Sequence, residues 1–139
     1  MQSITHELLN ELKNTSDIEA FFKAHDRNFI NKTTSDYLNE LIVIKNISIS
    51  DIAKNSGTGE YIYKVFKGIR KPSRDVLISV AFGMNLSLEE TQLLLRISKF
   101  AMLDSRDKRD SVIIYALTHG FTVFQTDDML DSKYLTTIN

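Results

Sequence analysis

Six basic side chains lie close together in the middle of the chain. They are Lys54, Lys64, Lys67, Arg70, Lys71 and Arg74. The same stretch holds one acid, Glu60, so its formal charge is +5, and because the whole chain carries −1 the rest carries −6. Cations gathered on one part of an otherwise acidic protein are typical of a surface that binds a polyanion. The sequence therefore predicts a nucleic-acid interface in this stretch.

Side chains that would support catalysis or metal binding are scattered or missing. The chain has no cysteine, and its three histidines (His6, His25 and His119) have no ligand partner at metal-binding spacing. Gly57-Thr58-Gly59 has a glycine spacing like that of a kinase loop, but no strand pattern surrounds it and no other kinase or Walker A motif follows. We expect no enzyme activity, no metal ion and no cofactor.

The elements that position the basic residues are predicted from helical spacing. Ile62, Val65, Phe66 and Ile69 recur at i, i+3, i+4 and i+7, so they predict one buried face of a short helix over about residues 59–67. Lys64, Lys67 and Glu60 fall on the opposite face, with Tyr61 and Tyr63 on its flanks. A short helix over 50–56 precedes it across a glycine turn, and a basic loop follows. Two helices in this arrangement predict a helix-turn-helix whose second helix enters the major groove.

The order of motifs from residue 33 to residue 90 resembles one known family. Four segments are similar, in order, to consecutive helices of Xre/Cro-type, lambda-repressor-like domains. They are Asn46 to Ala53, Ile62 to Gly68, Lys71-Pro72-Ser73 with the apolar run to Met84, and Asn85 to Glu90. The whole chain also resembles short helix-turn-helix proteins from Gram-positive bacteria. The resemblance implies a five-helix DNA-binding core and a role as a transcriptional regulator. It covers about 58 residues.

The residues expected to contact DNA come from the helix-turn-helix and the loop after it: Ser50, Thr58, Glu60, Tyr61, Tyr63, Lys64, Lys67, Arg70, Lys71 and Arg74. The cations are expected on backbone phosphates, Tyr61, Tyr63 and Lys64 on bases or sugars, and Glu60 on a cytosine amino group. Arg74 is at the same time a candidate for a fold-stabilising pair with its neighbour Asp75.

A second interpretation stays open beside DNA binding. Glu60 occupies the start of the predicted recognition helix, the turn before it is one residue shorter than is usual in the family, and Ser56 replaces the usual apolar residue before the turn glycine. These departures and the low net charge favour a protein-interaction adaptor that keeps the fold without binding DNA.

The whole chain reads as all-α. We expect an N-terminal helical hairpin over 1–32, the five-helix core over 33–103, and two further helices over 104–139. The hairpin's second apolar stripe includes Phe29 and Ile30, and its second helix is capped by Thr15 or Ser16. Further expected caps are Thr34 or Ser35, the capping boxes Ser87–Glu90 and Thr122–Gln125, and Gly120 at a helix end. The helix after Ser87 is expected to reach about Leu103, and residues 105–110 are predicted to form a capping and salt-bridge network.

Partners and location follow from the same reading. A lone helix-turn-helix covers one half-site, so the expected form is a homodimer on double-stranded DNA. The apolar stretches 112–117 and 123–130 are candidates for the dimer contact, with an intramolecular core as the alternative, and the terminal helices are candidates for a protein partner. No segment is a signal peptide or is apolar for long enough to cross a membrane, so we expect a cytoplasmic protein.

Overall fold

The computed structural model describes residues 4–26 and 32–139, and the regular elements in these two ranges are all helices. This confirms the all-α prediction. The chain divides into two compact units, Met1–Asn31 and Lys32–Asn139. The predicted packing positions Phe29 and Ile30 lie outside the described residues.

The first unit contains two short helices, α1 (Ile4–Asn14) and α2 (Ile18–Ala24). Among its described residues Phe21 is the buried apolar side chain, and the Phe21 ring lies 4.9 Å from that of His25. His25 in turn contacts Glu11 at 2.6 Å and so ties α2 back to α1. Asp17 caps α2 by accepting the backbone N–H groups of the next turn, so the expected cap at Thr15 or Ser16 was wrong.

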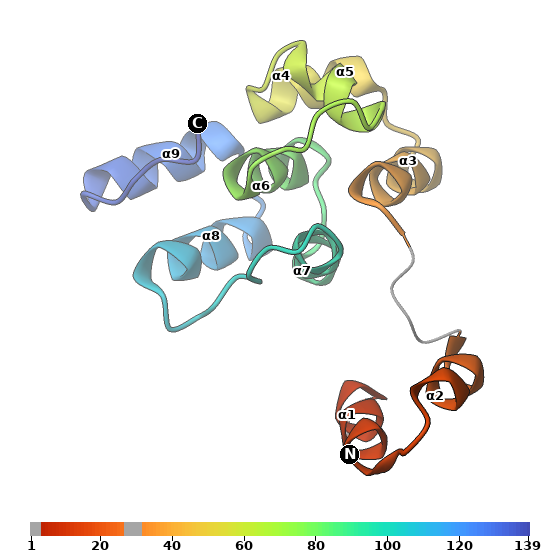
Figure 1. The fold of residues 1–139 in the computed structure, drawn as a ribbon. Coiled ribbons are helices and arrows are strands. Elements are labelled where there is room, and N and C mark those ends of the chain that lie inside the picture. The colour runs from red at the N-terminus through yellow and green to blue at the C-terminus, as the bar shows by residue number, and fades with distance from the viewer. Residues whose placement is uncertain (1–3, 27–31) are drawn as a thin grey trace. The chain divides into compact units, whose positions relative to one another are not determined.

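The second unit contains the other seven described helices. In chain order they are α3 (Thr34–Lys45), α4 (Ile49–Ser56), α5 (Tyr61–Phe66), α6 (Arg74–Gly83), α7 (Leu88–Ile97), α8 (Lys108–Thr118) and α9 (Val123–Ser132). Figure 1 shows α6 at the centre of this unit, with α4 and α5 on one side of it and α7 and α8 on the other. Helix α6 is buried from Leu77 to its end at Gly83, which fits its apolar run from Val76 to Phe82, interrupted only by Ser79.

One hydrophobic cluster runs through the second unit. It joins α3 to α7 through side chains such as Leu38, Leu77 and Leu94, and it continues into the C-terminal helices through Ile113 and Leu130. The buried side chains of α8 and α9 therefore belong to this unit's own core. Tyr115 and Phe124 stay about half exposed, at 48% and 51%.

Helix starts in this unit follow local hydrogen-bonding rules. The predicted capping boxes Ser87–Glu90 and Thr122–Gln125 are confirmed, and Gly120 has the left-handed φ of +73° expected after a helix end. At α3 the cap is Thr33, which forms a capping box with Asp36, one residue earlier than the predicted Thr34 or Ser35. Thr33 prevails because a carboxylate stands three residues after it.

Helix α7 ends at Ile97, and the expectation that it reaches Leu103 was wrong. Lys99 adopts a left-handed φ of +68°, and the Phe100 N–H donates back to the Leu95 carbonyl, which closes the helix. Gln92 then holds the following loop, since its side chain both donates to and accepts from the Leu103 backbone. The burial of Leu103 thus comes from a loop folded onto the core.

Candidate nucleic-acid interface

The candidate interface is built on two short helices joined by a glycine turn. Ser48 caps α4 through its hydroxyl, and Gly57, whose φ is +74°, follows its last residue, Ser56. Gly59 also has a positive φ, of +62°, so the four-residue turn to α5 uses two left-handed positions that glycine occupies at little cost. The chain thereby reverses within a few residues and places α5 beside α4.

Close packing explains the serine that stands before the turn. Ser56 is fully buried, and a Cβ added to Gly83 of α6 would lie 2.9 Å from the Ser56 Cβ and 3.0 Å from the Ile52 carbonyl oxygen. A large apolar side chain at residue 56 has no room against α6. The Ser56 hydroxyl, buried with the backbone, is satisfied by the Thr58 hydroxyl at 2.7 Å.

Residues near the C-terminal end of the chain support the same turn from outside. Asp127 accepts the backbone N–H groups of Ile138 and Asn139, at 2.6 Å and 3.1 Å. The Asn139 side chain donates to the Ser56 carbonyl at 3.2 Å, at the end of α4. Ile138 is buried in the core. The turn is therefore held by α6 on one side and by this terminal segment on the other.

Helix α5 is anchored by its inner face and by its last carbonyl. Ile62, Val65 and Phe66 are buried, as the spacing predicted. The Phe66 carbonyl accepts from the Ser35 hydroxyl at 2.6 Å and from the Asn39 amide at 2.8 Å, both on α3. The sequence does not predict these two anchors, because no local pattern links Ser35 or Asn39 to a residue about thirty positions later.

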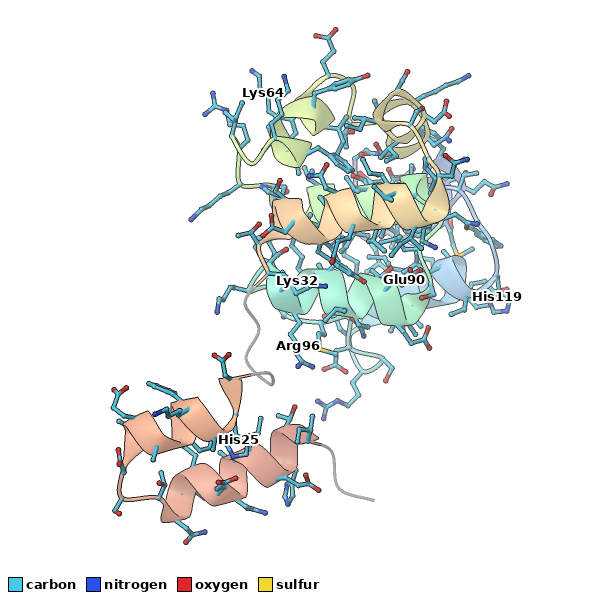
Figure 2. All side chains as sticks on the ribbon, turned by 90° about the vertical axis from the view of Figure 1, so that its right-hand side faces the viewer. His25, Lys32, Lys64, Glu90, Arg96 and His119 are labelled. Atoms are coloured by element: carbon cyan, nitrogen blue, oxygen red, sulfur yellow. The ribbon has the colours of Figure 1, made fainter. Side chains whose placement is uncertain are left out.

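The outer face of α5 forms a shallow open hollow of about 590 Å³, here called the α5 hollow. It is lined by Glu60, Tyr61, Tyr63, Lys64, Lys67 and Ile69. The two tyrosines are 37% and 39% exposed, and Figure 2 shows Lys64 projecting away from the body of the unit. This surface combines two cations, two aromatic rings and one carboxylate. It can contact phosphates, sugars or base edges, or a protein surface.

The loop between α5 and α6 adds two cations beside the hollow. Gly68 turns the chain with a φ of +74°, after which Arg70 and Lys71 are exposed and Pro72 is buried. Ile69 is 64% exposed, so its predicted place on the buried face was wrong: α5 ends at Phe66, and the helical spacing does not extend to residue 69. Within residues 4–26 and 32–139, no carboxylate pairs with Lys64, Lys67, Arg70 or Lys71.

Arg74 does not line the α5 hollow and instead pairs with Asp110. Its guanidinium makes a two-pronged contact with Asp110 at 3.1 and 2.9 Å and donates to the backbone carbonyls of Ala101 and Met102. Asp75 pairs with Arg109 at 3.0 Å, so the predicted Arg74–Asp75 pair is replaced by two longer-range pairs. These two ion pairs, together with Asp107, which caps α8, confirm the predicted capping and salt-bridge network around residues 105–110.

Two other sequence-predicted contact residues also lie apart from the α5 hollow. Ser50 is exposed on the first turn of α4, next to Asp51. Thr58 is half-buried in the turn, with its hydroxyl bonded to Ser56. The structure therefore brings together Glu60, Tyr61, Tyr63, Lys64 and Lys67, with Arg70 and Lys71 beside them, and leaves Ser50, Thr58 and Arg74 outside the group.

Shifted pKa values occur where α3 packs on α7. Burial, with the nearby carboxylates of Glu90 and Glu40, raises the pKa of the Tyr37 hydroxyl. Burial also acts to raise the pKa of Glu90, but the Ser87 N–H and the Lys45 ammonium outweigh it, so this pKa is lowered overall. The Lys45–Glu90 pair at 3.0 Å joins the end of α3 to the start of α7. These shifts belong to the scaffold of the interface.

No protein-family model, curated protein or solved structure matches this chain. Among the described residues no group of three histidine or carboxylate side chains is placed to hold a metal ion. In the same ranges, none of the helices has the length and apolar character needed to cross a membrane.

Proposed function

We propose that the Lys32–Asn139 unit binds double-stranded DNA as a transcriptional regulator. The outer face of α5 enters the major groove, and the loop after α5 contacts the backbone. The observation that carries this proposal is the set of four exposed cations, Lys64, Lys67, Arg70 and Lys71, none of which has a carboxylate partner among the described residues. DNA phosphates supply the missing negative charge, and the released counterions drive binding.

The rigidity of the scaffold supports the same proposal. Helix α5 has six residues and would not hold its shape alone in water. Its buried inner face and the two bonds from α3 to the Phe66 carbonyl hold in place the backbone that carries Lys64 and the two tyrosines. A preorganised surface loses little conformational entropy on binding.

Salt-dependent binding to a generic duplex tests the proposal. Four phosphate contacts predict a slope of log K against log salt of roughly −3.6, at about −0.9 per contact. The double variant Lys64→Ala with Lys67→Ala is expected to flatten the slope by about 1.8. The matched control is Lys108→Ala with Lys133→Ala, which removes two exposed lysines from α8 and the end of α9 and leaves the slope unchanged. Absence of wild-type binding even at about 50 mM salt would exclude DNA as the partner.

Sequence specificity needs a separate measurement. Helix α5 offers lysine, tyrosine and glutamate, and lacks the arginine, asparagine and glutamine that read bases most directly. A selection of bound duplexes from a random pool is expected to return a short common motif. A pool that stays random after several rounds would restrict the function to general DNA binding.

A homodimer is part of the proposal, because one recognition helix covers one half-site. Most apolar side chains of the stretches 112–117 and 123–130 are used by the unit's own core, which leaves Tyr115 and Phe124 as the large exposed ones. Sedimentation analysis with and without the selected duplex would show whether two chains bind each site.

The alternative is a protein-interaction adaptor, and one observation favours it. Ile69 is 64% exposed at the edge of the α5 hollow, beside Glu60 and the two tyrosines, a mixture common in protein interfaces. If the wild-type chain does not bind DNA, this surface becomes the candidate binding site for a protein partner. An Ile69→Asp variant that loses a captured partner, with Tyr134→Asp as the exposed control, would then support the adaptor.

A further inference from the structure

A second hollow lies where three segments of the Lys32–Asn139 unit meet. The segments are the start of α3, the loop between α5 and α6, and the loop after α7. The hollow has a volume of about 560 Å³ and is here called the Lys99 hollow. It shares no lining residue with the α5 hollow, although both border the loop around residues 67–70. Lys32, which lines this hollow and lies two residues before α3, is labelled in Figure 2.

The lining of this hollow is strongly basic. Lys32, Arg70, Lys71 and Lys99 contribute to it, and none of the described aspartates or glutamates does. Lys32 is paired with Glu40 at 2.7 Å, which leaves three cations. No described carboxylate pairs with Arg70, Lys71 or Lys99. Like charges around one hollow repel each other, and an anion placed among them relieves that repulsion.

Hydroxyl groups add hydrogen-bond donors to the same lining. Thr34 and Ser98 lie 2.6 Å apart through their hydroxyl oxygens. Such a pair uses one of its two hydroxyl hydrogens internally and leaves the other for a further acceptor. The Ser35 hydroxyl is already committed to the Phe66 carbonyl. The hollow thus combines three cations that have no described carboxylate partner with a hydroxyl hydrogen from the Thr34–Ser98 pair.

The position of Lys99 is set by the fold. Its backbone is left-handed, with a φ of +68°, and the turn is closed by hydrogen bonds from Lys99 to Arg96 and from Phe100 to Leu95. A lysine in this conformation costs roughly 1 kcal/mol that glycine or asparagine would largely avoid. The chain nevertheless has a cation here, at the rim of the hollow.

We propose that the Lys99 hollow binds a phosphate group, held by Arg70, Lys71 and Lys99. A guanidinium presents two parallel donors to one phosphate, and the two ammonium groups add further hydrogen-bond donors and positive charge around it. This adds the loop after α7 to the basic surface, from a part of the chain outside the stretch 54–74. The phosphate belongs either to the DNA backbone, in which case this inference rests on the proposed function, or to a free phosphorylated small molecule.

Amide NMR of the full chain tests phosphate binding independently of DNA. Inorganic phosphate is titrated at constant ionic strength, with chloride as the compensating anion. The amide signals of Gly68, Ser98 and Lys99 are expected to shift in a saturable way. Lys99→Asn removes the charge and tolerates the left-handed backbone, and it is expected to raise the Kd at least about fivefold. Lys133→Asn makes the same change at the end of α9 and is expected to leave the Kd unchanged.

Two results would overturn the proposal: wild-type shifts that chloride reproduces, or equal phosphate affinity in Lys99→Asn and Lys133→Asn. The spectra also show directly whether each variant is folded, so a folding failure is not mistaken for loss of the site.

A duplex titration then identifies the source of the phosphate. If the DNA backbone supplies it, Lys99→Asn flattens the salt slope by about 0.9 relative to Lys133→Asn, which is roughly eightfold in affinity at about 0.1 M salt. If phosphate binds but the two variants bind duplex equally, the ligand is a free phosphorylated small molecule. If wild type binds no duplex at all, the proposed function fails, and the inorganic phosphate titration alone decides the Lys99 hollow.

Discussion

Replacing Arg74 separates a structural role from a DNA contact. Its side chain is 23% exposed and that of Asp110 is 9% exposed, and together they link α6 to α8. In Arg74→Met the hydrocarbon stem is retained while four hydrogen bonds disappear, two to Asp110 and two to backbone carbonyls. The nearly buried Asp110 carboxylate then keeps one hydrogen-bond donor, the Asp104 N–H at 3.1 Å.

The expected loss of unfolding free energy follows from the low exposure of the Arg74 and Asp110 side chains. Breaking a buried ion pair from one side costs about 3–5 kcal/mol, because a charge remains without its partner. Water reaches the Arg74 side of the pair and screens part of this, so we expect Arg74→Met to lower the free energy of unfolding by about 2–3 kcal/mol. Replacing both partners, as Arg74→Met with Asp110→Leu, removes the stranded charge and is expected to cost at least about 1 kcal/mol less than the two single losses added together.

Urea unfolding followed by far-UV circular dichroism measures these free energies. The matched control is Arg106→Met, since Arg106 is 90% exposed in its pair with Asp104 and its loss is expected to leave stability close to wild type. Under conditions where both proteins are folded, Arg74→Met is expected to keep the wild-type salt slope for duplex binding. A variant of wild-type stability whose slope flattens by about one contact would refute this reasoning and return Arg74 to the interface.

Three further substitutions test the scaffold of the candidate interface. Gly83→Ala is expected to destabilise by about 1–3 kcal/mol, because its Cβ would lie 2.9 Å from that of Ser56, and a gain in unfolding free energy, as helix propensity alone predicts, would contradict this packing. Glu90→Gln keeps the capping box but loses the pair with Lys45. Because the folded-state pKa of Glu90 lies below its ordinary value of 4.5, the wild-type advantage is present above that value and lost as pH falls through the folded-state pKa. Urea titrations at about pH 7 and about pH 3 check this, and an equal difference at both would contradict it. Asn39→Ala is expected to cost about 1–2 kcal/mol in thermal or urea unfolding and to weaken duplex binding by loosening α5, and unchanged binding would show that the anchor is dispensable.

Much of the local structure was predictable because its causes are local. The capping boxes at Ser87 and Thr122 need only two residues three positions apart, so the pattern alone located the starts of α7 and α9. The inner face of α5 was predictable in the same way, since three apolar side chains at helical spacing share one side. The local rule failed at Ile69, because spacing does not say where a six-residue helix ends.

The positive charge of the candidate interface was predictable from the sequence, but the set of basic residues that form it was not. The stretch from residue 54 to residue 74 contains six basic residues, and the sequence alone does not distinguish the paired from the unpaired ones. Arg74 is withdrawn from that group by Asp110, a partner 36 residues later, while Lys99 joins Arg70 around a hollow although it lies outside the stretch. Only the folded chain decides which cations have carboxylate partners.

The basic surface around α5 thus depends partly on the sequence and partly on the tertiary structure. The sequence by itself determined that a short helix with a buried face and an outer face bearing lysines is followed by a basic loop, because composition and helical periodicity are properties of neighbouring residues. The tertiary structure decided what holds that helix in place and which charges remain free. Ser35, Asn39 and Asn139 reach α4 and α5 from about thirty or more residues away, and no local pattern carries such contacts.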